Sequence, residues 1–334
     1  MEKKSSIKSS TLLGRIWGFF QKCLFLVLSF GPMPNHIAFI MDGNRRFAKS
    51  RGIKQGGGHS IGFAALISTL QYCYEMGVKY VTVYAFSIDN FKRKPEEVQS
   101  VMKLMQEKID ELLKEESIVN EYGIRINFWG NLKLLSDPVR LAVEKAMTTT
   151  AKNTGPVLSV CVAYTSTDEI MHAIEESCTK KINKVQERNG SGYEIMENLV
   201  SVADLEQLLY TADCPDPDIV IRTSGETRLS NFLLWQTTFS HLQNPSPLWP
   251  EFSFRHLVWA ILEYQKEGGC EFNSDIPVAP EKFCCCWNLP QISIAPFSYV
   301  RRKKMAASGD SVIEAYRKSI CMLVIDKLQM RKSW

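Results

Sequence analysis

Several sequence patterns that mark common functional classes are missing from this chain. There is no G-x-x-x-x-G-K-[ST] phosphate loop, no H-E-x-x-H motif, and no second aspartate two residues after Asp42. Ten cysteines are present, but none form a C-x-x-C pair, and no histidines stand near them at zinc-ligand spacing. These absences exclude a P-loop kinase, a zinc protease and an aspartyl-phosphate phosphatase, and they indicate neither a disulfide framework nor a structural zinc site. The cysteine usage fits a reducing compartment that faces the cytosol.

A large net charge is missing as well. The chain has 334 residues, 45% of them hydrophobic, so it can bury a sizeable core, and its formal charge is only +4. Residues 1–35 carry five basic and one acidic side chain, and residues 266–334 carry eleven basic and seven acidic ones, so each end is +4 and the remainder is −4. Because a nucleic-acid binder needs a broad basic face, no nucleic-acid partner is expected. Basic ends suit an anionic membrane surface.

Residues 11–31 are the one candidate membrane segment in the sequence. Their apolar run is interrupted by Arg15, Gln21 and Lys22, and the uninterrupted part is far shorter than the roughly 20 residues of a spanning helix. Apolar residues nevertheless recur at spacings of three and four, which predicts one apolar helix face: Leu12, Ile16, Phe19, Phe20, Cys23 and Val27. We interpret residues 1–33 as a membrane-associating, interfacial segment. An uncleaved signal-like segment and a helix packed on the protein body remain as alternatives.

Strand-like and helix-like segments alternate along most of the chain. Apolar runs predict strands at His36–Met41, Lys79–Ser87, Ile124–Trp129, Val157–Thr165 and Asp218–Arg222. Helical spacing predicts helices at Ser60–Met76, Pro95–Ser117, Asp137–Lys152 and from about Thr167, then an exposed loop at Lys180–Gly192 and a capping box of Ser201 with Asp204. This order predicts an α/β fold with a mainly parallel central sheet flanked by helices. Residues 34–265 are expected to form this domain, and residues 266–334 a divergent tail.

The first candidate site follows the first predicted strand, at Asp42-Gly43-Asn44-Arg45-Arg46. Asp42 can hold Mg²⁺ against a diphosphate, Arg45 and Arg46 can pair with phosphate oxygens, and Gly43 lets a ligand approach the backbone closely. His59 follows a glycine run expected to be flexible, residues 56–58, so it can close over the same site. The alternative, that Asp42 caps a helix and the arginines are solvated, stays open.

The second candidate site follows another predicted strand, over residues 222–231, RTSGETRLSN. Arg222 and Arg228, with hydroxyl groups such as that of Ser230, surround a glycine turn and are suited to a second polyanion, because guanidinium groups bind phosphate in bidentate fashion. The alternative is a basic turn on a surface loop.

A weaker third candidate lies at residues 84–93, YAFSIDNFKR. Ser87 and Asn90 offer polar contacts at a strand end, and the spacing of Arg93 and Glu97 predicts an i to i+4 ion pair. Such a pair is more often a surface feature of little consequence.

Together these segments resemble the motifs of the cis-prenyltransferases, the family of undecaprenyl and dehydrodolichyl diphosphate synthases. The resemblance rests on five motifs in order: HIAFIMDGNRRFAK (36–49), GGGHSIG (56–62), YAFSIDNFKR (84–93), IRTSGETRLSNFLLWQ (221–236) and LWPEF (248–252). The residues of these motifs are most similar to those of eukaryotic catalytic subunits, in particular those of plants. No D-D-x-x-D motif of trans-prenyl synthases is present.

The resemblance implies an enzyme that extends an allylic diphosphate, such as farnesyl diphosphate, with isopentenyl diphosphate to give a long Z-polyprenyl diphosphate, as in dolichol or rubber-type synthesis. It implies that Asp42 binds Mg²⁺ and that Asp42, Asn44 and Asn90 are catalytic. It also implies a set of substrate-binding residues, which are Gly43, Arg45, Arg46, His59, Ser87, Phe91, Arg93, Glu97, Arg222, Arg228 and Ser230. Apolar side chains of the flanking helices are candidates to line a product tunnel, with ordinary core packing as the alternative for each: Phe63, Leu66, Ile67, Leu70, Leu104, Met105 and Leu112.

The sequence departs from the bacterial pattern at three places. His241 stands where bacterial members have a metal-binding glutamate, the arginine expected near Gln55 is missing, and so is a terminal R-x-G motif. Eukaryotic catalytic subunits share such losses and obtain the terminal motif from a Nogo-B-receptor-like subunit. We therefore expect a heteromer, peripheral to the endoplasmic reticulum membrane on its cytosolic face. A non-catalytic or tail-disabled subunit of such a complex is the alternative.

Overall fold

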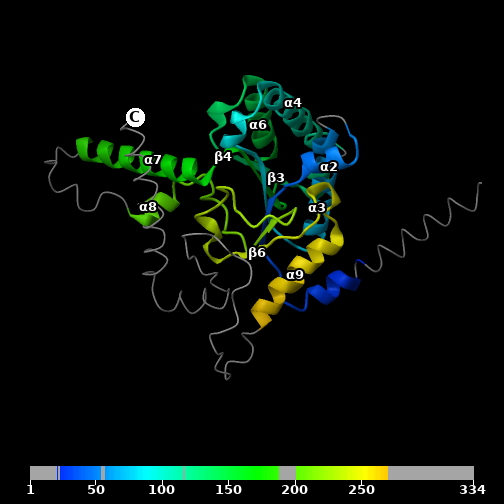
Figure 1. The fold of residues 1–334 in the computed structure, drawn as a ribbon. Helices are drawn as coiled ribbons and strands as arrows, with labels where there is room; N and C mark the ends of the chain where they lie inside the picture. Colours follow the sequence, from blue (N-terminus) through cyan, green and yellow to red (C-terminus); the bar gives the residue numbers. More distant parts are fainter. Residues whose placement is uncertain (1–20, 22, 54–56, 116, 188–200, 270–334) are drawn as a thin grey trace, which may run out of the picture.

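The computed structural model describes residues 21, 23–53, 57–115, 117–187 and 201–269 (Figure 1). Five subjects of the sequence analysis therefore lie outside the described residues: most of the N-terminal segment, Gln55, Gly56, residues 188–192 of the predicted loop and the tail from residue 270. Within the described part of the chain, no helix is both long and apolar enough to cross a membrane.

A six-stranded parallel sheet forms the centre of the molecule. Its strands are β1 (His36–Ile40), β2 (Tyr80–Ser87), β3 (Arg125–Trp129), β4 (Val157–Tyr164), β5 (Ile219–Arg222) and β6 (His241–Gln243), in the order β3-β4-β2-β1-β5-β6. All neighbouring strands are parallel. The predicted fold class is confirmed, and every predicted strand is present within two residues of its expected ends. Only β6, with three residues, has no apolar run long enough to predict it.

Helices flank this sheet. The labelled α-helices of the described residues are α2 (Asn44–Ser50), α3 (Gly57–Glu75), α4 (Pro95–Leu112), α5 (Ile118–Tyr122), α6 (Asp137–Thr150), α7 (Ser166–Glu187), α8 (Val202–Glu206) and α9 (Phe254–Gly269), and residues 23–28 are also helical. The same part of the chain has four 3₁₀ helices, which are η1 (Ile88–Lys92), η2 (Leu132–Leu134), η3 (Gln236–Phe239) and η4 (Trp249–Glu251). Side chains of β1 alternate between two cores: Ile37 and Phe39 join the large core under α3, α4, α6 and α9, whereas Ala38 and Ile40 face the loop after β5.

Two helix predictions need correction. The loop predicted at Lys180–Gly192 is wrong over residues 180–187, because α7 continues to Glu187 and projects from the body in Figure 1, while residues 188–192 lie outside the described residues. The helix predicted at Pro95–Ser117 ends at Leu112, and a separate short helix, α5, follows. The predicted capping box is confirmed, since Ser201 Oγ accepts a hydrogen bond from the backbone N–H of Asp204 at 3.1 Å.

The glycine run before His59 has a packing role that its composition did not indicate. Gly57 and Gly58 begin α3 rather than forming a flexible loop, so the predicted flexibility is wrong for these two residues. A Cβ at Gly58 would collide with the carbonyl oxygen of Asn44, and one at Gly62 would collide with the Asn44 side chain. Because these glycines lie four residues apart, they share one helix face. That face lets α2 lie directly against α3.

Candidate active site

The site forms where β1 and β5 end side by side. Ile40 of β1 pairs with Arg222 of β5, so Asp42 and Arg222 meet although 180 residues separate them in sequence. The Thr223 hydroxyl donates to the Asp42 carbonyl oxygen at 2.8 Å and accepts from the Asp42 N–H at 3.1 Å. Thr223 thus fixes the backbone of Asp42 to the end of β5.

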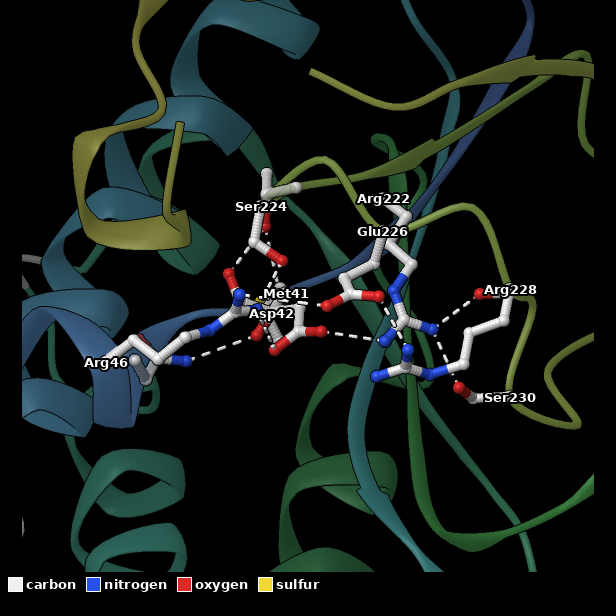
Figure 2. Close-up of polar contacts among 10 residues, drawn as sticks. Met41, Asp42, Arg46, Arg222, Ser224, Glu226, Arg228 and Ser230 are labelled. Carbon is white, nitrogen blue, oxygen red and sulfur yellow. Dashed lines mark hydrogen bonds and ion pairs between the residues drawn. The ribbon is translucent and has the colours of Figure 1, made fainter. Parts of the chain in front are cut away.

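Arg222 links the two sequence motifs through its guanidinium group. Its Nη2 donates to Asp42 Oδ2 at 2.7 Å, while Nη1 donates to Ser230 Oγ at 2.7 Å and to the carbonyl oxygen of Arg228 (Figure 2). The Arg222 side chain is only 7% exposed. Since a buried cation is stable only with hydrogen-bonding partners, Arg222 rigidly couples Asp42 to the Ser230 loop.

Two further arginines and a second carboxylate complete this half of the site. Arg46 donates to Ser224 Oγ at 2.6 Å and lies 3.3 Å from Asp42 Oδ1. Glu226 contacts both Arg46, at 3.7 Å, and Arg228, at 2.5 Å. Figure 2 shows these side chains converging from two chain segments, with Arg46 on one side of Asp42 and Arg222 on the other. Three guanidinium groups share two carboxylates here, which leaves a net positive site for an anion.

The arginines keep Asp42 ionised. Partial burial by itself would raise the pKa of Asp42, but the hydrogen bond and charge of Arg222, together with the charge of Arg46, outweigh burial and lower the pKa below its usual value. The carboxylate is therefore fully charged at neutral pH.

A second cationic cluster lies beside the first and contains Arg45, Arg93, His59 and Glu97. Glu97 Oε1 accepts from Arg93 at 3.1 Å and from Arg45 at 3.4 Å. The predicted Arg93–Glu97 pair is thus confirmed, and its side chains are only 26% and 20% exposed, so it is not a solvated surface pair. Burial chiefly, then the charges of Arg93 and Arg45, lower the pKa of His59 and favour its neutral form. Arg45 of this cluster and Arg46 of the first are consecutive residues of α2, so the two clusters are neighbours.

Ser87 and Asn90 shape the turn between these clusters. The Ser87 hydroxyl accepts from the Asp89 N–H at 3.2 Å, and Asn90 Oδ1 accepts from the Ser87 N–H at 3.2 Å, so the two residues cap η1. Phe91 packs edge-on against Phe86 at a centroid distance of 4.9 Å. A pocket of about 510 Å³ opens next to it, lined by Phe91, Arg93, Pro95, Val98, Gln99, Met102, Leu134, Leu135 and Ser136. An apolar pocket therefore adjoins the cationic cluster.

The Ser230 loop has an unusual backbone that α7 holds in place. Ser230, Asn231 and Leu233 have φ angles of 51°, 59° and 46°, a region that costs a non-glycine residue on the order of 1 kcal/mol or more. The start of α7 compensates: the Ser166 N–H donates to the Asn231 carbonyl at 2.8 Å, and the Thr167 N–H donates to Asn231 Oδ1 at 3.1 Å. We name these contacts the Asn231 clasp.

The oxygen ligands of the site, above all the Asp42 carboxylate, suit a Mg²⁺ ion that is also bound by substrate phosphates. Among the described residues, no three His, Cys, Asp or Glu side chains gather as a complete metal cage. Mg²⁺ does not need one, because it is commonly bound by one or two carboxylates together with substrate phosphates and water. Asp42, 27% exposed and ionised at the mouth of an arginine-rich site, fits that pattern. His241 lies at the start of β6 near Gln243 and Tyr264.

The structure brings most predicted site residues into these two neighbouring clusters. Gly43, with φ 109°, precedes α2, and a Cβ there would press on Leu248. Of the proposed tunnel residues, Leu66, Leu70 and Leu112 are buried in the core, as their alternative reading held, whereas Phe63, Ile67 and Met105 pack on it only partly buried. Sequence reasoning did not single out Thr223, Glu226 or Asn231. All three lie in the motif at 221–236, which could have indicated a role in the site. Their contacts with residues of other segments could not be predicted from the sequence.

Comparison with known proteins identifies the class. The family model for undecaprenyl diphosphate synthases (Prenyltransf) matches residues 40–269. The chain is 56% identical over 278 residues to dehydrodolichyl diphosphate synthase CPT3 of Solanum lycopersicum, covering 80% of this chain and 96% of that protein. It is 44% identical over 239 residues to the dehydrodolichyl diphosphate synthase complex subunit DHDDS of Homo sapiens, covering 72% and 69%.

A solved structure supports the same assignment. Lavandulyl diphosphate synthase from Lavandula x intermedia, in complex with dimethylallyl diphosphate, superposes with a TM-score of 0.60 at 30% identity and covers 70% of this chain and 95% of that one. The chain belongs to the cis-prenyltransferase family and is similar to its plant members. It is a prenyl transferase of the type that makes polycis-polyprenyl diphosphates.

Proposed function

We propose that this chain is the catalytic subunit that condenses isopentenyl diphosphate with an allylic diphosphate, farnesyl diphosphate in the first round. The observation that carries the proposal is the convergence of Asp42, Arg46, Arg222 and Arg228 at the carboxyl ends of β1 and β5. Two diphosphates must lie side by side for a condensation. The site offers two neighbouring groups of cations: Arg45 and Arg46, one from each cluster, at the start of α2, and Arg222 and Arg228 at the end of β5 and in the loop after it. A scaffold subunit would have no use for an ionised aspartate among them.

The first group of cations is assigned to the allylic diphosphate. Arg45 and Arg46 flank Asp42 at the start of α2, and neither is buried, with 66% and 50% of the side chains exposed. Both can therefore turn toward a ligand. Gly43 is buried against Leu248, and its φ of 109° is what requires a glycine there. Mg²⁺ held by Asp42 would neutralise charge on the departing diphosphate. Arg45 and Arg46 donate to the same oxygens, so that the negative charge is stabilised as the allylic carbon becomes cationic.

The second group is assigned to isopentenyl diphosphate. Arg228 is 61% exposed and has Glu226 as its protein partner, while Ser230 Oγ is held by Arg222. The Asn231 clasp fixes the hydroxyl and guanidinium groups before the substrate arrives, which lowers the cost of ordering them on binding. Asn44 and Asn90 are assigned to assist ionisation and removal of the proton that leaves as the Z double bond forms. His59, Ser87, Phe91, Arg93 and Glu97 support the allylic side.

Partner and location complete the proposal. The human relative is named as a subunit of a dehydrodolichyl diphosphate synthase complex, and this supports a heteromer with a Nogo-B-receptor-like subunit. The long apolar product and the apolar, basic N-terminal sequence support peripheral association with the cytosolic face of the endoplasmic reticulum membrane. Dolichol and rubber-type products use the same chemistry, so the product class depends on chain length.

The test is Mg²⁺-dependent incorporation of labelled isopentenyl diphosphate onto farnesyl diphosphate. The purified full chain is assayed with and without a Nogo-B-receptor-like subunit, and product length is resolved. Long Z-polyprenyl products that require the partner are the expected result. Turnover by the chain alone would remove the partner from the proposal. No turnover with the partner demonstrably bound would favour a non-catalytic or tail-disabled subunit.

A further inference from the structure

The described end of the N-terminal segment exposes an apolar helix face. Residues 23–28 are helical, and exposed side chains follow the spacing i, i+3, i+4 and i+7 through Cys23, Leu26, Val27 and Phe30. Leu26 and Val27 are each 62% exposed and Phe30 is 84% exposed. The opposite face, with Leu24, Phe25 and Leu28, packs on the large core. A helix that is apolar all round on a protein surface is incompletely covered.

The helix α9 presents a second exposed stripe. Its outward positions are Arg255, Trp259, Leu262 and Lys266, which follow one another at spacings of four, three and four. Trp259 is 63% exposed and Leu262 is 43% exposed, whereas the inner face of α9 is buried. An aromatic and an aliphatic side chain between two basic ones is the pattern of a helix at a membrane–water boundary.

These two apolar surfaces adjoin each other. The rings of Phe25 and Phe254 meet edge-on at 5.5 Å, and Gln265 Nε2 donates to the Leu28 carbonyl at 2.7 Å. The side of α9 that contacts the N-terminal helix includes Gln265, which directly precedes Lys266 of the exposed stripe. Successive residues of a helix differ by about 100°, so the contact side and the exposed stripe lie about a quarter turn apart. Figure 1 shows the N-terminal helix (blue) lying along α9 (yellow) at the rim of the molecule.

We propose that Leu26, Val27 and Phe30 of the N-terminal helix, with Trp259 and Leu262 of α9, form one docking face for an anionic lipid bilayer. We call it the α9 docking face. The apolar spacing of Cys23 and Val27 continues back in the sequence to residue 12, and residues 1–35 carry four net positive charges, which complement an anionic surface. Arg255 lies about one turn before Trp259, and Lys266 lies about one turn after Leu262, so a basic group stands at each end of the stripe. The inference rests on the proposed function only in that a polyprenyl product needs a bilayer to receive it.

Vesicle co-sedimentation of the purified full chain tests the role of α9. With vesicles containing about one third anionic phospholipid, we expect Trp259→Ser combined with Leu262→Ser to lower the partition coefficient about tenfold. The matched control is Leu141→Ser on α6, because Leu141 is 61% exposed and lies on another helix. It should bind as wild type does. Arg255→Gln combined with Lys266→Gln should lose about fivefold per charge on anionic vesicles and nothing on neutral ones.

Three outcomes would overturn the α9 docking face. Unchanged partition of the Trp259, Leu262 double variant would show that α9 does not meet the lipid. An equal loss for Leu141→Ser would show that any exposed leucine has this effect. Light scattering that reveals a lipid-free dimer, dissociated by the double variant, would assign the face to a second copy of the chain. Turnover in detergent is measured in parallel, so that failure of the proposed chemistry is separate from failure of docking.

Discussion

At the scale of single residues, the pair of Asp42 and Arg222 sets the chemistry of the site. Each member depends on the other: Arg222 is almost fully buried and needs a counter-ion, and Asp42 owes its lowered pKa chiefly to Arg222 once burial is overcome. The same carboxylate thus serves both the folded structure and the proposed binding of Mg²⁺. Its removal affects both, and the two effects are separable by measurement.

Replacing Asp42 by alanine should reduce turnover by at least about a hundredfold, because charge stabilisation of this kind commonly contributes that much. It should also lower the free energy of unfolding by about 1–3 kcal/mol, since a buried donor of Arg222 loses its partner. Steady-state kinetics and denaturant unfolding measure the two effects. Asp137→Ala, in an exposed pair with Arg140, is the control and should change neither. Wild-type turnover in Asp42→Ala would reject the proposed mechanism.

His36 makes the stability of the fold dependent on pH. Burial lowers its pKa from 6.5 to about 4, and its ring is held between Pro215 O at 2.6 Å and Thr82 Oγ1 at 2.8 Å. The unfolded chain binds a proton below about pH 6.5 while the folded chain does not, so stability present above that pH is lost as the pH falls toward 4. Relative to His36→Gln, wild type should lose about 2–3 kcal/mol between pH 7 and 4.5. Urea unfolding at each pH checks this, and parallel profiles would contradict it.

At the scale of elements, the sequence predicted those strands and helices that a local pattern of apolar residues determines. Buried parallel strands are continuous apolar runs, so β1, β2, β3, β4 and β5 were found, and the strand-end motifs then indicated both candidate anion sites. The short β6 had no such pattern, because only its pairing with β5 makes it a strand. The helical state of residues 180–187 escaped prediction because polar side chains on a projecting helix resemble a loop.

The glycines at the start of α3 show why some features could not be predicted from the sequence: they depend on contacts between distant segments. A glycine run in sequence indicates freedom, yet Gly58 and Gly62 are needed because Asn44 of α2 packs against them. Nothing in residues 56–62 identifies that partner. The same holds for the clasp: Asn231 stood inside a recognised motif, but the start of α7 that holds it comes from a segment 64 residues away.

The α2–α3 contact leads to a prediction about Asn44. Gly62→Ala should displace the Asn44 side chain, since the added Cβ has no room, and should lower turnover about tenfold or more while costing about 1–3 kcal/mol of stability. Ser60→Ala, at an exposed position of the same helix, should leave both unchanged. Thermal unfolding and steady-state kinetics are the measurements. Wild-type behaviour of Gly62→Ala would mean that α2 can shift without harm to the site.

At the scale of the whole molecule, ligand binding and folding stability are linked, because the cationic clusters exist only in the folded chain. Pyrophosphate with Mg²⁺ at a hundred times its dissociation constant should stabilise the protein by about 2.7 kcal/mol and raise Tm by several degrees. Arg228→Gln should lose most of this shift. Arg140→Gln, on α6 and also paired to carboxylates, should keep it. Equal shifts in both variants would exclude Arg228 from the anion site, whatever the turnover.

The neighbouring positions of β1 and β5 also determine when the site can exist. During synthesis β1 emerges early and pairs with β2 on one edge, but its other edge has no partner until residues 219–222 have been made. Contacts of such long sequence separation form late in folding, because the chain must first lose the entropy of a long loop. A nascent chain lacking β5 therefore has an open β1 edge and Asp42 without Arg222. The candidate site therefore cannot assemble until β5 has been synthesised, and until then the unpaired edge of β1 is open to pairing with another chain.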